Sequence, residues 1–317
     1  MSAPDRPQIE ATGQPLGEET EGAVPAEASG DAAAIARRSP GRLALRRFLA
    51  NHMATVSAVF ILIVIVLAVF APWLTPYGPT EVNLQAYRDP PSMQHWLGTD
   101  SAGRDVLTRL LYAGRVSLSV GLAAALGAGI VGLVLGTLAG TIGGRVDSVI
   151  MRTADVVLSF PSLVVVLVFA GLFGPSLQTI ILALALFEWP TASRIVRGLT
   201  LSLREREFVE AARAIGSSEL RVMARHIAPS VLPPLAVVVT LLVAQAILVE
   251  SALSFLGYGV QPPTPSWGNM LTDAQSITIL SRMPWLWLSP GVLIALTVLA
   301  VNFVGDGLRD AIDPNQS

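Results

Sequence analysis

The sequence contains no cysteine and no lysine, and it has few charged side chains. All 21 of its positively charged residues are arginine, and charged residues make up only 14% of the 317-residue chain. Without cysteine, the chain forms no disulfide, thiolate nucleophile or zinc–thiolate site. Without lysine, it has no nucleotide-binding loop of the Walker type, no Schiff-base lysine and no serine–lysine pair. The formal net charge of -2 and the lack of a concentrated basic patch argue against nucleic-acid binding.

Long apolar runs take the place of charge. Hydrophobic residues make up 52% of the chain, and charged residues only 14%. A soluble domain carries about 25% charged residues to cover its water-facing surface. Six runs approach the ~20 residues that cross a bilayer as a helix. They lie at 54–73, 117–142, 156–172, 177–195, 232–255 and 285–304. The sequence therefore predicts an all-α integral membrane protein with about six transmembrane helices.

The arginines set the expected orientation of these helices. They precede the first run and follow the second and fourth runs, and positive residues are retained on the cytoplasmic side. Both termini are therefore predicted to be cytoplasmic. Residues 1–41, rich in Ala, Glu, Gly and Pro, are predicted to be a disordered cytoplasmic tail. We further expect a basic flank and first transmembrane helix at 42–75, an extracytoplasmic segment with an interfacial helix at 76–115, and a core with five transmembrane helices at 116–317.

The segment 204–229 is the most polar stretch expected to be ordered, and it lies between two apolar runs. Its first half places apolar side chains at i, i+3, i+4 and i+7 from Phe208 to Ile215, as in an amphipathic helix. Gly216 then interrupts the pattern. A second amphipathic helix is expected to begin at Ser217 or Ser218 and to end before Pro229. The segment is thus predicted to be a pair of short helices at the membrane surface.

Several motifs together resemble one protein family. The spacing of Glu210-Ala211-Ala212, Gly216 and Ile227-Ala228-Pro229 resembles the EAA loop of the membrane subunits of ABC importers, which docks into a groove on the ATPase subunit. Ala228 departs from the pattern, since many members have Leu there. The stretches HWLGTDSAGRDVLTRLLYAGRVSLSVG, ESALSFLGYGVQPPTPSWGNML and DGLRDAIDP resemble the C-type permease subunit of dipeptide, oligopeptide and nickel importers. The resemblance covers nearly everything after about residue 41.

This resemblance implies a type I ABC importer permease in the bacterial cytoplasmic (inner) membrane, with no catalytic residues of its own. It implies four kinds of neighbour: a second permease subunit forming a heterodimer, two ATP-binding subunits, an extracytoplasmic substrate-binding protein and membrane lipid. No cofactor would bind the chain directly, because the partner subunits would hydrolyse ATP. The residues expected to form the ATPase-coupling loop are Phe208, Glu210, Ala211, Ala212, Arg213, Ile215, Gly216, Ile227 and Pro229.

The cargo is expected to be a dipeptide or oligopeptide, which is the commonest assignment in the resembling family. Nickel, opines, glutathione and oligosaccharides are the alternatives within the same role. An ion-coupled secondary transporter is the rival class, and it would be favoured by inverted repeats and paired intramembrane carboxylates. Neither feature is evident in the sequence.

Two acidic residues, Glu188 and Glu250, fall within predicted spans. A charged side chain at the bilayer centre costs roughly 2.5–3.5 kcal/mol on insertion scales, so such groups usually face a cavity or a partner. Both are candidates for lining a translocation path, and Glu250 is equally a candidate brace between helices. Small residues recur every four positions along the second run, among them Gly132, Gly136 and Gly140. This spacing predicts a close helix-packing face, within the chain or against another subunit.

No catalytic or metal-binding constellation is expected. The three histidines lack metal-ligand spacing and are predicted to lie at interfaces or on the surface, and the serines lack nearby histidine and acid partners. Asp105 and Arg109 stand at i and i+4 opposite an apolar face. We therefore expect them to belong to an amphipathic helix lying on the outer leaflet.

Overall fold

The computed structural model describes residues 40–312. The chain divides into two units, residues 1–43 and 44–317, and apart from residues 40–43 the features described here belong to the second unit. The tail predicted at 1–41 lies outside the described residues except for its last two, where helix α2 (Pro40–Ala50) begins. The described part of the chain is helical and has no strand; its one extended pairing is an isolated bridge between Thr99 and Asp105.

Five of the helices are long and apolar enough to cross a membrane, or six if one bent pair counts as a span. They are α3 (His52–Val69), α5 (Val106–Ile142), α8 (Leu177–Leu203), the continuous stretch Glu219–Phe255 and α14 (Trp285–Ile312), with α6 (Gly144–Leu158) and α7 (Ser162–Phe173) as the bent pair. α5 has 37 residues and so extends about 55 Å, well beyond a hydrocarbon core of about 30 Å. The prediction of about six spans is confirmed.

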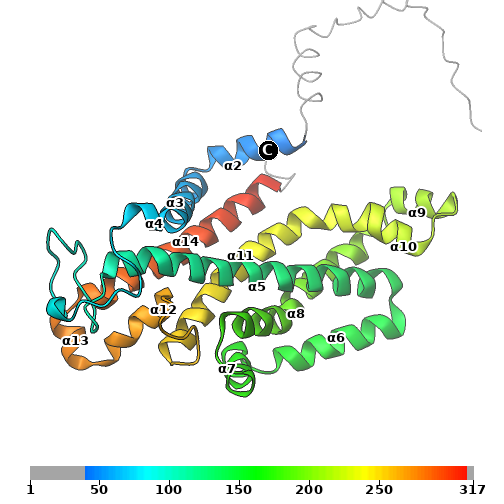
Figure 1. Ribbon diagram of the computed structural model, residues 1–317. Coiled ribbons are helices and arrows are strands. Elements are labelled where there is room, and N and C mark those ends of the chain that lie inside the picture. Colours follow the sequence, from blue (N-terminus) through cyan, green and yellow to red (C-terminus); the bar gives the residue numbers. More distant parts are fainter. Residues whose placement is uncertain (1–39, 313–317) are drawn as a thin grey trace, which may run out of the picture. The chain divides into compact units, whose positions relative to one another are not determined.

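The remaining elements are short, apart from α11 (Ala228–Phe255), which forms most of the stretch Glu219–Phe255. They are α4 (Ala71–Leu74), a 3-10 turn (Leu84–Ala86), α9 (Glu207–Ala214), α10 (Glu219–Val222), a π-helical turn (Met223–Ile227), α11, α12 (Trp267–Met270), a second 3-10 turn (Leu271–Gln275) and α13 (Ile277–Arg282). α10 and the π-helical turn run into α11 without a break, and the three together form the continuous stretch Glu219–Phe255. Figure 1 shows α9 and α10 at one end of α5, α8 and α11, with α12 and α13 at the other.

The third span, predicted over 156–172, is divided between two helices. α6 and α7 are bent by 85°, and the bend contains Pro161, which disfavours helix at the residue before it. α6 also carries Arg145, Asp147, Arg152 and Asp155. Asp147 pairs with Arg197 of α8 at 2.5 Å, and Asp155 pairs with Arg194. These ion pairs hold the polar arm of the bent pair against α8.

The residues expected to form an interfacial helix within 76–115 are continuous with a membrane-spanning helix, because they form the first turns of α5. Asp105 is the N-cap of α5 and accepts a hydrogen bond from the backbone N–H of Thr108 at 2.7 Å. Its other oxygen lies 2.9 Å from Nδ1 of His95, which is buried within the chain, whereas an interface or surface position was expected. Arg109 pairs with Asp100 at 3.3 Å instead of with Asp105. The tertiary contacts therefore override the i, i+4 pattern.

The first span also ends earlier than predicted. α3 stops at Val69, and α4 begins with Ala71-Pro72 after a turn at Phe70. The guanidinium group of Arg115 on α5 donates to the carbonyl oxygens of Ala68 and Val69, each at 2.6 Å. A cation at a helix C-terminus satisfies carbonyls that lack intrahelical partners.

The core of the second unit is the packing of α5 along α8 and α11. A methyl group at Gly132 would lie 2.5 Å from Cβ of Ala192, one at Gly136 would lie 2.6 Å from the carbonyl oxygen of Ser193, and one at Gly140 would lie 2.6 Å from Cβ of Thr200. Real Cβ atoms do not approach so closely. The three glycines thus let α5 and α8 pack backbone to backbone, within this chain.

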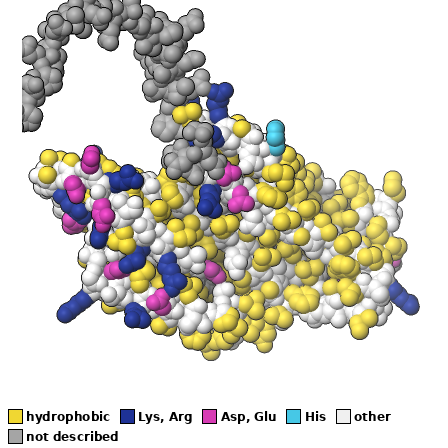
Figure 2. Space-filling view, turned by 180° about the vertical axis from the view of Figure 1, so that it is seen from behind, with side chains coloured by type: hydrophobic (Ala, Val, Ile, Leu, Met, Phe, Trp, Pro, Cys, Tyr) yellow, Lys and Arg dark blue, Asp and Glu magenta, His cyan; other side chains and the backbone are white. Residues whose placement is uncertain are grey.

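The surface has two parts. Exposed apolar side chains cover the long helices, including Val56, Leu62 and Ile130, which are each more than half exposed. On the face shown in Figure 2, charged side chains gather toward the end that carries α9 and α10, while hydrophobic side chains spread over the middle of the molecule. This distribution fits a bilayer around the middle and water at the ends.

Candidate functional site

The first candidate site is the hairpin formed by α9, the turn at Gly216 and α10. α8 leads into α9 after three residues, and α10 continues through the π-helical turn into α11. Gly216 has a φ of +84°, and a Cβ placed there would meet nothing within 4 Å. Glycine is therefore favoured by the backbone conformation and not by crowding. The hairpin is connected directly to two membrane-spanning helices.

The inner face of the hairpin is anchored to the core. Val209, Val222 and Ile227 are fully buried, and Ala212 is 6% exposed. They belong to one apolar cluster with residues of α5, α8 and α11. Ala212 and Ile227, which the sequence places in the coupling loop, therefore support the hairpin from within and present no exposed surface. Val209 was not predicted, although it stands three residues before Ala212 on the same face.

The outer face of the hairpin is apolar and exposed. Phe208 is 45% exposed, Ile215 is 84% exposed and Leu220 is 68% exposed. Ala211 is exposed between Phe208 and Ile215. The structure thus places three of the four apolar residues expected on the docking face, Phe208, Ala211 and Ile215, at the surface. Leu220, on the second arm, adds to this face.

An ion pair closes the hairpin across its turn. The Arg213 guanidinium donates to both carboxylate oxygens of Glu219, at 2.9 and 3.0 Å. Two-point pairing fixes orientation as well as distance. Glu210 and Pro229, which the sequence also places in the coupling loop, are both exposed. The sequence analysis did not identify Glu219, because its pairing with Arg213 depends on a turn that brings together positions six residues apart.

Glu250 is a buried junction between three helices. Its side chain is fully buried and accepts hydrogen bonds from Ser117 of α5 at 3.0 Å and Ser254 of α11 at 2.7 Å. The Ser117 oxygen in turn accepts from the backbone N–H of Trp267, at the start of α12, at 3.1 Å. Of the two roles expected for Glu250, this geometry matches the brace.

Glu188 lies apart from this network and lines a cavity of about 130 Å³. The cavity is bounded by Val157, Leu158, Phe160, Ser162, Val165, Phe187, Glu188 and Gln245. These residues come from α6, α7, α8, α11 and the bend between α6 and α7. The Oε1 atom of Glu188 is buried, and no hydrogen-bond partner within residues 40–312 reaches it. Glu188 is therefore the carboxylate that faces a cavity.

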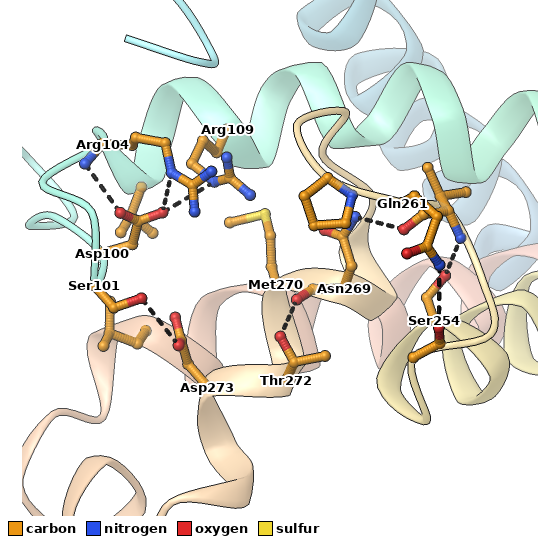
Figure 3. A pocket seen from close by; sticks show the side chains of 15 residues that line it. Asp100, Ser101, Arg104, Arg109, Ser254, Gln261, Asn269, Met270, Thr272 and Asp273 are labelled. Carbon is orange, nitrogen blue, oxygen red and sulfur yellow. Dashed lines mark hydrogen bonds and ion pairs between the residues drawn. The ribbon is translucent and has the colours of Figure 1, made fainter. Parts of the chain in front are cut away.

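A second, larger pocket of about 250 Å³ is lined in part by α12 and the 3-10 turn after it, at the end opposite the hairpin. Figure 3 shows the side chains that line it. Asp100 forms ion pairs on one side of it, at 2.7 Å with Arg104 and 3.3 Å with Arg109. Across the pocket, Asp273 accepts a hydrogen bond from Ser101 at 3.3 Å. Burial raises the pKa of Asp273, and the negative charge of Asp100 raises it further. The sequence analysis assigned no role to Asp273, since its neighbours come from 172 residues away.

Neither pocket has the donor set of a metal site. Within residues 40–312, no three His, Asp or Glu side chains gather closely enough to hold a metal ion. The candidate sites therefore comprise an exposed apolar hairpin, a braced junction, a carboxylate-lined cavity and a mixed-charge pocket.

Comparison with known proteins gives a consistent result. The family described as binding-protein-dependent transport system inner membrane component matches residues 132–317. The N-terminal transmembrane domain of oligopeptide transport permease C matches residues 39–91.

Two relatives and one solved structure extend this match. A protein of Brucella suis biovar 1 (strain 1330), assigned as a peptide permease, is 40% identical over 279 residues, which is 88% of this chain and 92% of its own. The glutathione transport system permease protein GsiD of Shigella flexneri serotype 5b is 42% identical over 278 residues, or 87% of this chain and 91% of its own. A chain of the MetNI methionine ABC transporter in an inward-facing conformation aligns with a TM-score of 0.52 at 18% identity, covering 64% of this chain and 96% of that chain. The last comparison shows a shared fold.

Proposed function

This chain belongs to the family of binding-protein-dependent transport system inner membrane components, and we propose that it forms the path through which an ABC importer moves dipeptides or oligopeptides. Membership of this family identifies the chain as a multi-pass inner membrane permease subunit. Such a subunit is the translocating and generally non-catalytic part of an ABC transporter. In the proposed complex, it pairs with a second permease subunit above two ATP-binding subunits. A substrate-binding protein delivers cargo from the other side.

The exposed apolar face of the hairpin carries this proposal. Phe208, Ile215 and Leu220 are exposed within the charged segment 204–229, which is expected to face water, where apolar surface is favoured only if a partner covers it. The hairpin's inner face is anchored to the core by Val209 and Val222. A partner that moved the outer face would therefore move α8 and α11 with it. The ATP-binding subunit is the proposed partner.

The proposed orientation places the hairpin in the cytoplasm. Arginines are concentrated toward this end, among them Arg145 and Arg152 of α6 and Arg194 and Arg197 in the second half of α8, as the positive-inside rule requires. The pocket lined by Asp100 and Asp273 would then open to the extracytoplasmic side. Cargo released from a binding protein would enter at that end.

ATP-driven closure of the two ATP-binding subunits would bring their docked hairpins together. Since α8 and α11 pack on α5, the movement would reorient the three helices as a group and switch the path between its outward- and inward-facing states. The chain itself makes and breaks no covalent bond in this cycle. Its contribution is to transmit movement and to line the path.

The assignment of peptide as cargo rests on the names of relatives at 40% and 42% identity, one assigned to peptides and one to glutathione, itself a short peptide. The test is uptake by the complete complex reconstituted in proteoliposomes with its binding protein. Labelled dipeptide, tripeptide, glutathione and nickel are supplied in parallel, with ATP or a non-hydrolysable analogue. Uptake of peptide that requires ATP hydrolysis supports the proposal. Uptake of nickel alone would support the assignment as an importer but would reject peptide as its cargo.

A further inference from the structure

The cavity beside Glu188 lies at the middle of the membrane-spanning region. Glu188 is 11 residues from the start of α8 at Leu177, and Gln245 is 10 residues from the end of α11 at Phe255. At 1.5 Å per residue, these positions are each about 15 Å from the same end of the bundle. That depth is close to half of a hydrocarbon core of about 30 Å. Two polar side chains on different helices therefore meet one cavity at mid-membrane.

The face that carries Gln245 is unsuited to lipid. Gln245 is exposed on α11, flanked at i-4 and i+3 by Leu241 and Leu248, which are 46% and 45% exposed. A primary amide placed against acyl chains would lose its hydrogen bonds to water without replacement. In the same cavity, the Ser162 hydroxyl interacts with the Glu188 carboxylate, but the buried Oε1 atom of Glu188 has no hydrogen-bond partner in the described chain. Both observations indicate that a polar ligand or water occupies this place during function.

The lining indicates which ligand would fit. Its polar groups are the Glu188 carboxylate, the Gln245 amide and the Ser162 hydroxyl, and the other five lining residues are Val157, Leu158, Phe160, Val165 and Phe187. The lining therefore contains no arginine or histidine to neutralise the carboxylate. A buried carboxylate is stable when a positive charge and hydrogen-bond donors approach it. The cavity volume of about 130 Å³ corresponds to about four water molecules, enough for an ammonium group and its adjoining carbons.

We propose that Glu188, Gln245 and Ser162 bind the ammonium group of the cargo as it crosses mid-membrane. The inference rests on the proposed function, since it takes a peptide with a free amino terminus as the cargo. Glu188 supplies the counter-charge, while Gln245 and Ser162 accept hydrogen bonds from the remaining ammonium N–H groups. The cavity wall includes the bend between α6 and α7. A change in that bend would enlarge or close the site.

Site-specific photo-crosslinking tests this assignment in the complete complex. Phe187, which lines the cavity, is replaced by p-benzoylphenylalanine, and radiolabelled dipeptide is supplied with a free or an acetylated amino terminus. We expect label on this chain with the free amine, and about fivefold less with the acetylated peptide, because only the ammonium pairs with the carboxylate. Glu188→Gln should reduce free-amine labelling to the acetylated level. The matched control Glu81→Gln, in the segment before α5, should leave labelling unchanged.

The same preparation separates failure of this inference from failure of the proposed function. If the complex with native Phe187 takes up peptide with ATP, but both peptides label equally or Glu188→Gln changes nothing, the ammonium site is rejected and the importer stands. Crosslinking of position 187 to the second permease subunit alone would also reject it and assign the cavity to the subunit interface. If the wild-type complex takes up no peptide of either kind, the proposed function fails and the ammonium site fails with it.

Discussion

Arg213 and Glu219 lie on opposite sides of the Gly216 turn and form a two-point ion pair, with N–O distances of 2.9 and 3.0 Å. Arg213 also lies within 3.5 Å of the carbonyl oxygen of Arg204, at the end of α8. A single side chain thereby connects the two arms of the hairpin to the helix that precedes it. This arrangement suggests that the pair sets the angle at which the exposed apolar face is presented.

Reversing one charge of this pair should impair coupling. Both side chains are partly exposed, so the expected loss of coupling is modest. For Arg213→Glu we expect the ATP hydrolysed per peptide transported to rise roughly two- to fivefold. The double variant Arg213→Glu with Glu219→Arg restores opposite charges and should recover most of the coupling. The ratio is measured in proteoliposomes by phosphate release and labelled uptake. Equal defects in the single and double variants would argue that the pair has no role.

Gly216 should tolerate only residues that accept its backbone conformation. With φ at +84° and open space around it, the expected cost of another side chain is conformational, about 1–2 kcal/mol for most residues and less for Asn. Gly216→Val should therefore reduce uptake while ATP hydrolysis continues, and Gly216→Asn should remain close to wild type. Parallel ATPase and uptake assays check both. Similar behaviour of the two variants would show that the turn geometry is unimportant for coupling.

Glu250 should matter more for stability than for transport. Glu250→Ala leaves the Ser117 and Ser254 hydroxyls without their buried acceptor, which should cost about 2–4 kcal/mol. Glu250→Gln retains a carbonyl acceptor and should lose less. Thermal unfolding of the purified complex and the yield of assembled complex measure the effect. A stable Glu250→Ala complex with little uptake would instead place this carboxylate in the path.

Gly136 should be intolerant of even one added methyl group. The Cβ of Gly136→Ala would lie 2.6 Å from the Ser193 carbonyl oxygen, so α5 and α8 would have to separate, at a cost of about 1–3 kcal/mol. Gly198 is the matched control, because it lies within α8 and a Cβ there meets nothing within 4 Å. Gly198→Ala should be neutral or slightly stabilising, since alanine favours helix. Thermal unfolding distinguishes the two, and equal effects would contradict close packing at Gly136.

Asp273 should make stability depend on pH in a predictable direction. Burial and the neighbouring Asp100 raise its pKa in the folded chain, so the folded state binds more protons than the unfolded state between the unfolded value of about 3.9 and the raised folded value. Stability contributed by this group therefore falls as pH rises through that window.

The variant Asp273→Asn removes this titration while keeping an acceptor for Ser101. Its unfolding temperature should match that of wild type below the window and exceed it above, when both are measured across a pH series. Asp306→Asn, an exposed carboxylate on α14, is the control and should show no such divergence. A constant difference between Asp273→Asn and wild type at every pH would contradict the raised pKa.

Much of the fold follows from local sequence patterns. The apolar runs identify the membrane-spanning helices, because a helix in lipid must satisfy its backbone internally and present apolar side chains outward. Gly216 marks the hairpin turn, where the structure has a positive φ. The four-residue spacing of Gly132, Gly136 and Gly140 predicts a close packing face, and each glycine lies against α8.

Other features depend on contacts between distant positions. Asp105 and Arg109 look like partners at i and i+4, but Asp105 contacts His95 and Arg109 contacts Asp100. Phe208 and Ala212 share one face by helical spacing, yet Phe208 is 45% exposed and Ala212 is 6% exposed. The third span is broken at Pro161 and stabilised by ion pairs from α6 to α8. Neither the ion-pair partners nor the buried side of the hairpin can be identified from residue spacing along one helix.

By itself, the sequence determined that this chain crosses a membrane as helices, where its hairpin turns and which small residues permit close packing. These properties depend on residues near one another in the chain. Only the tertiary structure decided that Glu250 is buried among hydrogen-bond donors from other parts of the chain, that Glu188 faces a cavity with Gln245, and which side of the hairpin is exposed. A carboxylate's role in a membrane depends on whether hydrogen-bond donors from other helices reach it, and the folded arrangement alone brings those donors close or leaves them away.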